Sequence, residues 1–557
     1  MPTSASSAAD APIIMTDCGP VSGAVDPVKL SNASVWRYSS IPFAAPPVGD
    51  LRWRAPAARS CPWTGPLNGR AVPSSGSAAP SECTQHGGLT GGEDCLYLHV
   101  VRPAAAPPVG GWPVLVYFHG GNLIGGGTPG MLGPSAVMAT QVAGGAVVVA
   151  AAYRLGPLGW LADDVFKDES GFSGNYGALD AVAALRWVQA NALAFGGDAS
   201  RVTIFGQSSG GTLIFTLLAM PSANNLFTGA YSMSGSPNIT MDHAAKLAQD
   251  APIVANLGCG GQAGPARAAC LRGKPAAMVS AVQPAPWGTP GIFGWLPSGL
   301  PPPEAGGMAY FGITHVDGVV VTLPFDDALV NQTVNASVII SNMEAECDGG
   351  PAITVRNQTD AEWSATVAAA FSAWPGGGAA EAEALIAAYA AEAAVDKQLA
   401  YDSASADYGL TCAGRAIAQK LLAAATPRTQ PVYLLFNALQ QSSGEWSPSG
   451  NGRWPFHGLD LRLLGWSWGS PPAAQDLAEA TLMQRLLGDY AMHRGVFPDS
   501  WAWPPVAGPH SKGGVYTMVL ALEGGFPGGG VRAELDFKAA QCAGLKQLAG
   551  QAYWWCD

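Results

Sequence analysis

The segment Gly206-Gln207-Ser208-Ser209-Gly210 constrains the fold of this 557-residue chain more than any other. It carries the pattern G-x-S-x-G between an apolar run at 202–205 and an apolar stretch that begins near Gly211. A strand before this pattern and a helix after it form a sharp turn that exposes the serine hydroxyl, while the glycines prevent side-chain clashes. The pattern predicts Ser208 as a nucleophile. The alternative is a tight turn whose hydroxyl caps its own helix.

Two further apolar runs, at 114–118 and 146–150, are continuous rather than alternating, which is typical of strands buried on both faces. The segment 178–194 has helical apolar periodicity, and a second helical region is expected at 379–400. This alternation predicts an α/β fold with a large central, mostly parallel mixed sheet flanked by helices.

The chain shows no internal repeat and no linker that divides it, so we predict one domain over 11–557. The Ser/Ala-rich residues 1–10 are expected to be disordered. The Pro/Gly-rich segment 283–307 is predicted to form a long surface loop that lines or covers a site.

The charge of the chain excludes several classes of partner. There are 28 Lys and Arg against 40 Asp and Glu, a net charge of −12. Such a surface is poorly suited to nucleic acid, because few cations could displace the counterions of phosphates, and to anionic membranes. No apolar run approaches the ~18–20 residues that a membrane-spanning helix requires. The first ten residues do not resemble a signal peptide.

A serine nucleophile requires hydrogen-bond donors for the negative charge that develops on the substrate oxygen. His119-Gly120-Gly121-Asn122 directly follows the apolar run at 114–118 and resembles the H-G-G-G loop that supplies such donors. We expect the backbone N–H groups of Gly121, Asn122 and Ser209 to form this oxyanion hole. An ordinary glycine turn after a buried strand is the alternative.

Four more segments resemble the type-B carboxylesterase/cholinesterase/lipase family. Residues 38–49 are similar to its GIPYAxPPVG segment, 93–98 to its EDCLYLN signature, and 153–159 and 195–202 to two further family motifs. The motifs stand in family order, and the resemblance runs from about Cys18 to the end of the chain. It implies an α/β-hydrolase fold with long loop excursions around the active site.

The resemblance also implies a glutamate that orients the catalytic histidine. The family places this acid in a G-x-N-x-[DE]-E-G-like segment after a strand, and alignment by offset selects Glu346. Ser341 and Cys347 stand where the family usually has glycine, so Glu344 and Asp348 remain competitors. Either acid could hold an imidazole in the required tautomer.

The implied base is His457, in a Phe-His-Gly-Leu-Asp segment that resembles the family's HGxD/E motif. It follows the serine and the acid in the chain order Ser, Glu, His. His119 is interpreted as a packing residue of the oxyanion loop.

The implied function is a serine carboxylic ester hydrolase that acts through an acyl-enzyme on neutral esters. No Trp lies in the short loop between Cys83 and Cys95, and Gln207 stands where the family usually has a glutamate, which argues against choline esters. A triacylglycerol lipase and a non-catalytic adhesion or binding protein are the alternatives. The absence of C-x-x-C and H-E-x-x-H patterns predicts no metal, and no cofactor is implied.

The resemblance implies disulfides Cys83–Cys95 and Cys259–Cys270 and, by analogy with cholinesterases, Cys412–Cys542. Cys18, Cys61, Cys347 and Cys556 have no assigned partner. Disulfides are typical of secreted proteins, and N-x-S/T sequons occur at Asn32, Asn238, Asn331, Asn335 and Asn357. We expect a glycoprotein in the secretory pathway, with a small-molecule or lipid ester as its partner. The oligomeric state is not indicated.

Overall fold

The computed structural model describes residues 11–28, 31–63, 65–70, 82–85, 90–282, 313–346, 348, 355–371, 379–439, 442, 454–465, 473–521 and 530–549. The N-terminal segment 1–10, the predicted surface loop 283–307, Cys347 and Cys556 lie outside these residues.

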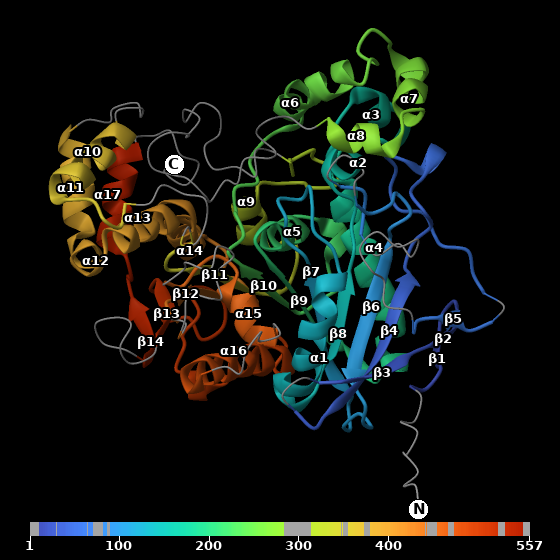
Figure 1. Ribbon diagram of the computed structural model, residues 1–557, viewed down its shortest axis with the longest axis horizontal. Coiled ribbons are helices and arrows are strands. Elements are labelled where there is room, and N and C mark those ends of the chain that lie inside the picture. The colour runs from blue at the N-terminus through green and yellow to red at the C-terminus, as the bar shows by residue number, and fades with distance from the viewer. Residues whose placement is uncertain are drawn as a thin grey trace, which may run out of the picture.

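An 11-stranded sheet runs through the described chain, in the order β14-β13-β12-β11-β10-β9-β7-β8-β6-β4-β3 (Figure 1). In this spatial order, the neighbouring strands β13, β12, β11, β10, β9, β7 and β8 pair in parallel. At one edge of the sheet β6, β4 and β3 pair antiparallel, and at the other edge β14 pairs antiparallel with β13. The strands are β3 (Ala24–Pro27), β4 (Ser34–Pro42), β6 (Tyr97–Pro103), β7 (Trp112–Phe118), β8 (Val147–Ala151), β9 (Gly197–Gln207), β10 (Gly229–Met233), β11 (Ser337–Met343), β12 (Val432–Asn437), β13 (Tyr516–Ala521) and β14 (Gly530–Leu535). This sheet confirms the predicted mixed, mostly parallel architecture, with β7, β8 and β9 at the three apolar runs.

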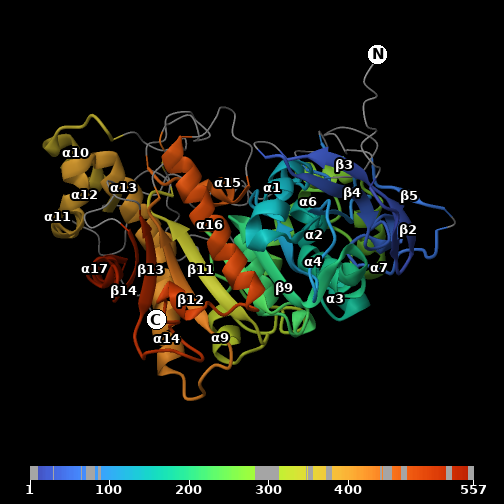
Figure 2. The ribbon, with the colours of Figure 1, turned by 90° about the horizontal axis from the view of Figure 1, so that it is seen from below.

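The two faces of the sheet are buried by different helices. Val114 and Val116 of β7 belong to a hydrophobic cluster with α4 and α5, while Leu115 and Tyr117 belong to another with α1, α15 and α16. Successive side chains of a strand point to opposite faces, so a continuous apolar run satisfies both layers. Figure 2 shows α16 lying across the second face. These helices are α1 (Leu132–Gln141), α4 (Tyr176–Asn191), α5 (Ser209–Leu218), α15 (Leu459–Gly465) and α16 (Ala474–Met492).

Two groups of helices lie beyond the sheet (Figure 1). One contains α2 (Gly156–Trp160), α3 (Asp164–Ser170), α6 (His243–Asn256), α7 (Gly264–Arg272) and α8 (Ala276–Ala281). The other contains α10 (Asp360–Phe371), α11 (Ala379–Ala388), α12 (Ala390–Val395), α13 (Lys397–Ala406) and α17 (Ala539–Ala549), with α14 (Cys412–Ala423) beside it and α9 (Phe325–Val330) nearer the sheet. None of the described helices has the length and apolarity to cross a membrane.

The helical region predicted at 379–400 is divided into three helices. Asp396 interrupts it, because this residue has an extended backbone (φ −161°) and its side chain accepts a hydrogen bond from Gln398 N–H at the start of α13. The other predicted helix, 178–194, corresponds to α4 followed by a short 3₁₀ turn. The one-domain organisation stays a prediction.

Four disulfides link the described residues. Cys83–Cys95, Cys259–Cys270 and Cys412–Cys542 confirm the expected pairs, and Cys412–Cys542 joins α14 to α17. Cys18 and Cys61, for which the sequence suggested no partner, form the fourth.

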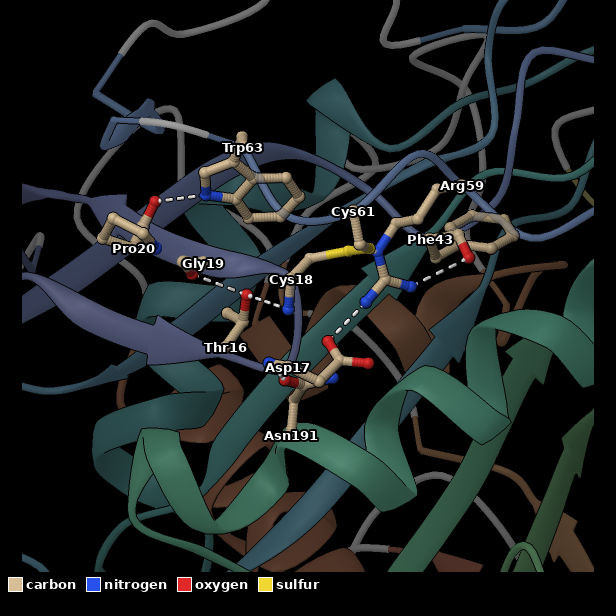
Figure 3. Close-up of a disulfide and its surroundings, with 10 residues drawn as sticks. All are labelled: Thr16, Asp17, Cys18, Gly19, Pro20, Phe43, Arg59, Cys61, Trp63 and Asn191. Atoms are coloured by element: carbon tan, nitrogen blue, oxygen red, sulfur yellow. Dashed lines mark hydrogen bonds and ion pairs between the residues drawn. A yellow bond between two sulfur atoms is a disulfide. The ribbon is translucent and has the colours of Figure 1, made fainter.

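The Cys18–Cys61 disulfide lies beside a small three-stranded sheet of β1 (Ile14–Thr16), β2 (Gly19–Ser22) and β5 (Leu67–Asn68). Figure 3 shows Arg59 against this disulfide, with its Nε 2.8 Å from Cys18 Sγ. The same guanidinium pairs with Asp17 and donates to Phe43 O at 3.3 Å. The contact fastens the loop around residue 60 to the N-terminal strands.

Candidate active site

Ser208 lies on a strained turn between β9 and α5. Its backbone has φ +61° and ψ −129°, and its N–H donates to Met233 O at 2.8 Å. The flanking glycines are required because the backbone is crowded: a Cβ on Gly206 would lie 2.5 Å from the Gly210 carbonyl, and one on Gly210 would lie 2.2 Å from Phe118 O. A nucleophile elbow has this geometry.

The loop predicted to form the oxyanion hole, residues 119–126 and called the oxyanion loop below, runs beside this elbow. A Cβ on Gly120 would lie 3.0 Å from Ser208 Cβ, so only glycine permits such a close approach. Leu123 N–H donates to Ser209 Oγ at 3.1 Å and fastens the loop to the start of α5. The backbone N–H groups of Gly121 and Asn122 donate to no other group among the described residues. Two unengaged donors beside a serine suit the binding of an oxyanion.

His119 is part of the packing of this loop. Its ring stacks on Tyr153, with centroids 4.4 Å apart and an interplanar angle of 17°, and Tyr153 Oη donates to His119 O at 2.6 Å. Burial lowers the pKa of His119 to about 4, with the Gly120 carbonyl acting in the opposite direction. The ring is therefore neutral at physiological pH, in keeping with the packing role expected for it.

Gln85 holds the far end of the oxyanion loop and was not singled out by the sequence. Its Nε2 donates to Gly126 O at 2.8 Å, and its Oε1 accepts from Gly126 N–H at 2.8 Å. Nε2 also lies 3.2 Å from Cys83 O, in the segment closed by the Cys83–Cys95 disulfide. The sequence indicated only a disulfide in this region, and the role of Gln85 follows from its burial and its contacts with Gly126.

Glu346 and His457 are in direct contact. His457 Nδ1 lies 2.5 Å from Glu346 Oε2, and Glu346 Oε1 accepts from Met343 N–H at 2.7 Å. The Glu346 side chain is completely buried, whereas that of His457 keeps a small exposed fraction. A carboxylate on Nδ1 fixes the imidazole tautomer and leaves Nε2 as the basic nitrogen.

The segment that carries His457 also lies beside the turn at Ser208. A Cβ on Gly458 would stand 3.5 Å from both Cδ and Nε2 of Gln207. Gly458 follows His457 and Gln207 precedes Ser208, so this packing brings the three candidate residues to one place at the carboxyl ends of the parallel strands. Sites in open α/β sheets occur at this edge.

The two competing carboxylates have other surroundings. Burial raises the pKa of Glu344 to about 8; Lys538 lowers it, and Glu392 and Asp407 raise it. Asp348 accepts a hydrogen bond from Trp454 N–H at 2.7 Å instead of contacting the imidazole. The geometry therefore favours Glu346 over both.

A third acid, Asp460, is buried close to this pair. Burial and the negative charge of Glu346 raise its pKa to about 7, while hydrogen bonding and His457 act in the opposite direction. Within the described ranges, no cluster of three or more His, Cys, Asp or Glu is arranged to hold a metal ion.

Comparison with known proteins places this geometry in a family. The family model described as "Carboxylesterase family" matches residues 10–490. The chain is similar to an acylcarnitine hydrolase of Mus musculus, with 36% identity over 285 residues (49% of each chain), and to a cocaine esterase of Homo sapiens, with 37% identity over 282 residues (49% of each chain). A fumonisin B1 esterase of Sphingopyxis macrogoltabida is 42% identical over 217 residues, 38% of each chain.

The chain spans about half the length of the first two of these relatives. Among solved structures, the chain is similar to one titled PNB esterase, with a TM-score of 0.69 and 24% identity. The alignment covers 96% of this chain and 99% of the other. The two structures share their fold over nearly the whole of this chain, which confirms the expected α/β-hydrolase fold.

Proposed function

Because this chain belongs to the carboxylesterase family, we propose that it is a serine carboxylic ester hydrolase with Ser208, Glu346 and His457 as its catalytic triad. The observation that carries the proposal is the contact between His457 Nδ1 and Glu346 Oε2 in a segment packed against the Ser208 elbow. A carboxylate, an imidazole and a strained serine together form the set that acyl transfer requires.

Acylation begins when Ser208 Oγ attacks the ester carbonyl carbon while His457 Nε2 takes the hydroxyl proton. The carbonyl oxygen becomes an oxyanion, which accepts hydrogen bonds from the N–H groups of Gly121, Asn122 and Ser209. Collapse of this intermediate breaks the bond to the alkoxy oxygen. The alcohol leaves with the proton from His457, and the acyl group stays on Ser208.

Deacylation repeats these steps with water as the nucleophile. His457 removes a proton from water, the hydroxide oxygen attacks the acyl carbon, and the proton returns to Ser208 Oγ as the carboxylic acid departs. Glu346 keeps its contact with His457 Nδ1 and stabilises the imidazolium that forms in each half-reaction.

Neutral carboxylic esters are the proposed substrate class. The side chain that precedes the nucleophile is the uncharged amide of Gln207, which is 9% exposed. A quaternary ammonium ester gains nothing from such a group, whereas a neutral ester avoids the cost of desolvating a charge.

We also propose that the protein follows the secretory pathway. The four disulfides among the described residues are of the kind that persists in oxidising compartments. The sequon asparagines Asn32, Asn331, Asn335 and Asn357 are exposed, and Asn238 is partly exposed. Glycosidase treatment of protein made in a eukaryotic secretory host should lower its mass, and an unchanged mass would argue against glycans at these sites.

The test of the function is hydrolysis of p-nitrophenyl esters of increasing acyl length by the wild type and by Ser208→Ala. Activity that is lost in the variant supports the acyl-enzyme mechanism. Preference for short, soluble esters supports an esterase, while a sharp rise on dispersed long-chain glycerides indicates a lipase. A folded wild type without activity would move the assignment to a binding protein.

A further inference from the structure

The two segments that carry Glu346 and His457 of the proposed triad run side by side and are linked at three points. We call them the acid turn, residues 344–346 and 348, and the histidine segment, residues 454–458. Ala345 N–H donates to Pro455 O at 3.0 Å, Glu346 contacts His457, and Trp454 N–H donates to Asp348 Oδ2 at 2.7 Å. Only the second of these links belongs to the triad.

Asp348 forms a hydrogen bond within the acid turn as well as the one to the histidine segment. Its own N–H donates to Ala345 O at 2.9 Å, so the turn folds around Glu346 and the Asp348 side chain emerges toward the histidine segment. The residue is 4% exposed. A buried carboxylate that accepts from a backbone N–H forms a short, charge-assisted bond that is costly to break.

Arg356 partly balances the charge of Asp348. Arg356 Nη2 lies 3.9 Å from Asp348 Oδ1, and Arg356 Nε lies 3.7 Å from Asp396 Oδ2. The pKa of the nearby Asp402 is raised well above its ordinary value, first by burial and then by the charge of Asp348. Arg356 lies on the side of Asp348 Oδ1, while Oδ2 accepts the hydrogen bond from Trp454 N–H.

The chain between Trp454 and His457 has little freedom to absorb a displacement. Pro455 has a backbone φ that is fixed by its ring, and Phe456 is 1% exposed within the hydrophobic cluster that also contains α15 and α16. A shift of the Trp454 backbone is therefore transmitted to the imidazole.

We propose that Asp348 is a positioning residue that holds His457 in line with Glu346 by binding the backbone N–H of Trp454. The inference rests on the proposed function. Asp348 touches neither the imidazole nor the elbow in any contact described above, and acts through the histidine segment. Displacing a catalytic group by about 1 Å can cost on the order of 10²-fold in rate.

The test compares Asp348→Ala and Asp348→Asn with the wild type on p-nitrophenyl butyrate. Asp348→Ala removes the acceptor, and we expect kcat per folded molecule to fall about 10- to 100-fold with KM changed less than about 2-fold. Asp348→Asn keeps an oxygen that can accept from Trp454 N–H, and should restore most of kcat. If Asp348→Ala does not fold, Asp348→Glu carries the test, because the added methylene displaces the carboxylate and should lower kcat about 10-fold.

Asp163→Ala is the matched control. Asp163 is 5% exposed, accepts from Val165 N–H at 3.0 Å and lies 3.5 Å from Arg267 Nη1. The variant therefore loses an equivalent pair of contacts, at the start of α3. It should be less stable than the wild type with kcat unchanged.

Two results would overturn the inference while the wild type hydrolyses the ester: kcat of Asp348→Ala within about 2-fold of wild type, or no rescue in Asp348→Asn. In the backup experiment, an unchanged kcat in Asp348→Glu would do the same. Failure of the proposed function is recognised separately, because the wild type and Asp163→Ala would then both lack activity that depends on Ser208. That outcome overturns the positioning role together with the function.

Discussion

Gly458 lies beside the side-chain amide of Gln207: a Cβ on Gly458 would stand 3.5 Å from Gln207 Cδ and Nε2, so the residue after the proposed base neighbours the residue before the proposed nucleophile. The φ of Gly458, +87°, is a backbone conformation that favours glycine. Within the described residues, Gln207 Nε2 has no hydrogen-bond partner. The site therefore has a neutral amide beside the residue that follows His457.

Gln207→Glu tests this electrostatic relationship. A carboxylate at this position favours protonated His457, so a higher pH is needed to produce the neutral base. We expect the acid limb of the kcat/KM profile to move up by about one pH unit. Gln189→Glu on α4 is the control and should leave the profile unchanged. An unshifted acid limb in Gln207→Glu would contradict the proximity of Gln207 to the base.

Glu346→Gln should lower kcat by about 10³- to 10⁴-fold, because an amide cannot stabilise the imidazolium and can favour the wrong tautomer. Glu344→Gln, two residues earlier in the same turn, is the matched control and should keep nearly the wild-type kcat. Steady-state kinetics on one ester decides between them. The reverse order of effects would reassign the catalytic acid to Glu344.

Gln85→Ala should loosen the oxyanion loop at Gly126, since both hydrogen bonds of the amide to that residue are lost. Removing one oxyanion donor outright costs about 10²- to 10³-fold in kcat, so a displaced loop should cost less, about 10-fold, with KM little changed. Gln189→Ala serves as control, because Gln189 Nε2 also bridges two backbone carbonyls, those of Ala199 and Leu226. Equal kcat values for the two variants would show that Gln85 is only structural.

The buried Glu344 predicts a dependence of stability on pH. Its folded pKa of about 8 lies above the ordinary value of 4.5, so between these values the folded state holds a proton that the unfolded state has released. The contribution of Glu344 to the free energy of unfolding is therefore fully present below about pH 4.5 and is lost as the pH rises toward 8.

Glu344→Gln should remove this loss. Between pH 5.5 and 8, the free energy of unfolding of the wild type should fall relative to the variant by up to about 3 kcal/mol in urea titrations. Glu383→Gln, at an exposed position of α11, should follow the wild type. Parallel curves for the wild type and Glu344→Gln would mean that Glu344 is ionised in the folded protein.

The local motifs made most of the fold predictable. The run at 202–205, the glycines at 206 and 210 and the apolar start of α5 each favour the same turn, so they specify it without help from the rest of the chain. The continuous apolar runs likewise specified β7 and β8, because both faces of these strands are covered.

What the sequence left open depended on contacts between distant segments. Glu344, Glu346 and Asp348 have equivalent chemistry, and only the path of the turn directs one of them to His457. Cys18 and Cys61 are separated by 43 residues, and no spacing rule links them. The role of Gln85 depends on Gly126, 41 residues away.

The proposed chemistry depends above all on Ser208 as a nucleophile activated by His457. The most direct measurement is intact-protein mass spectrometry after treatment with a fluorophosphonate, followed by peptide mapping. We expect one adduct per chain, located on Ser208, that forms rapidly in the wild type and much more slowly in His457→Ala. No adduct on folded wild-type protein, or an adduct on another residue, would contradict it.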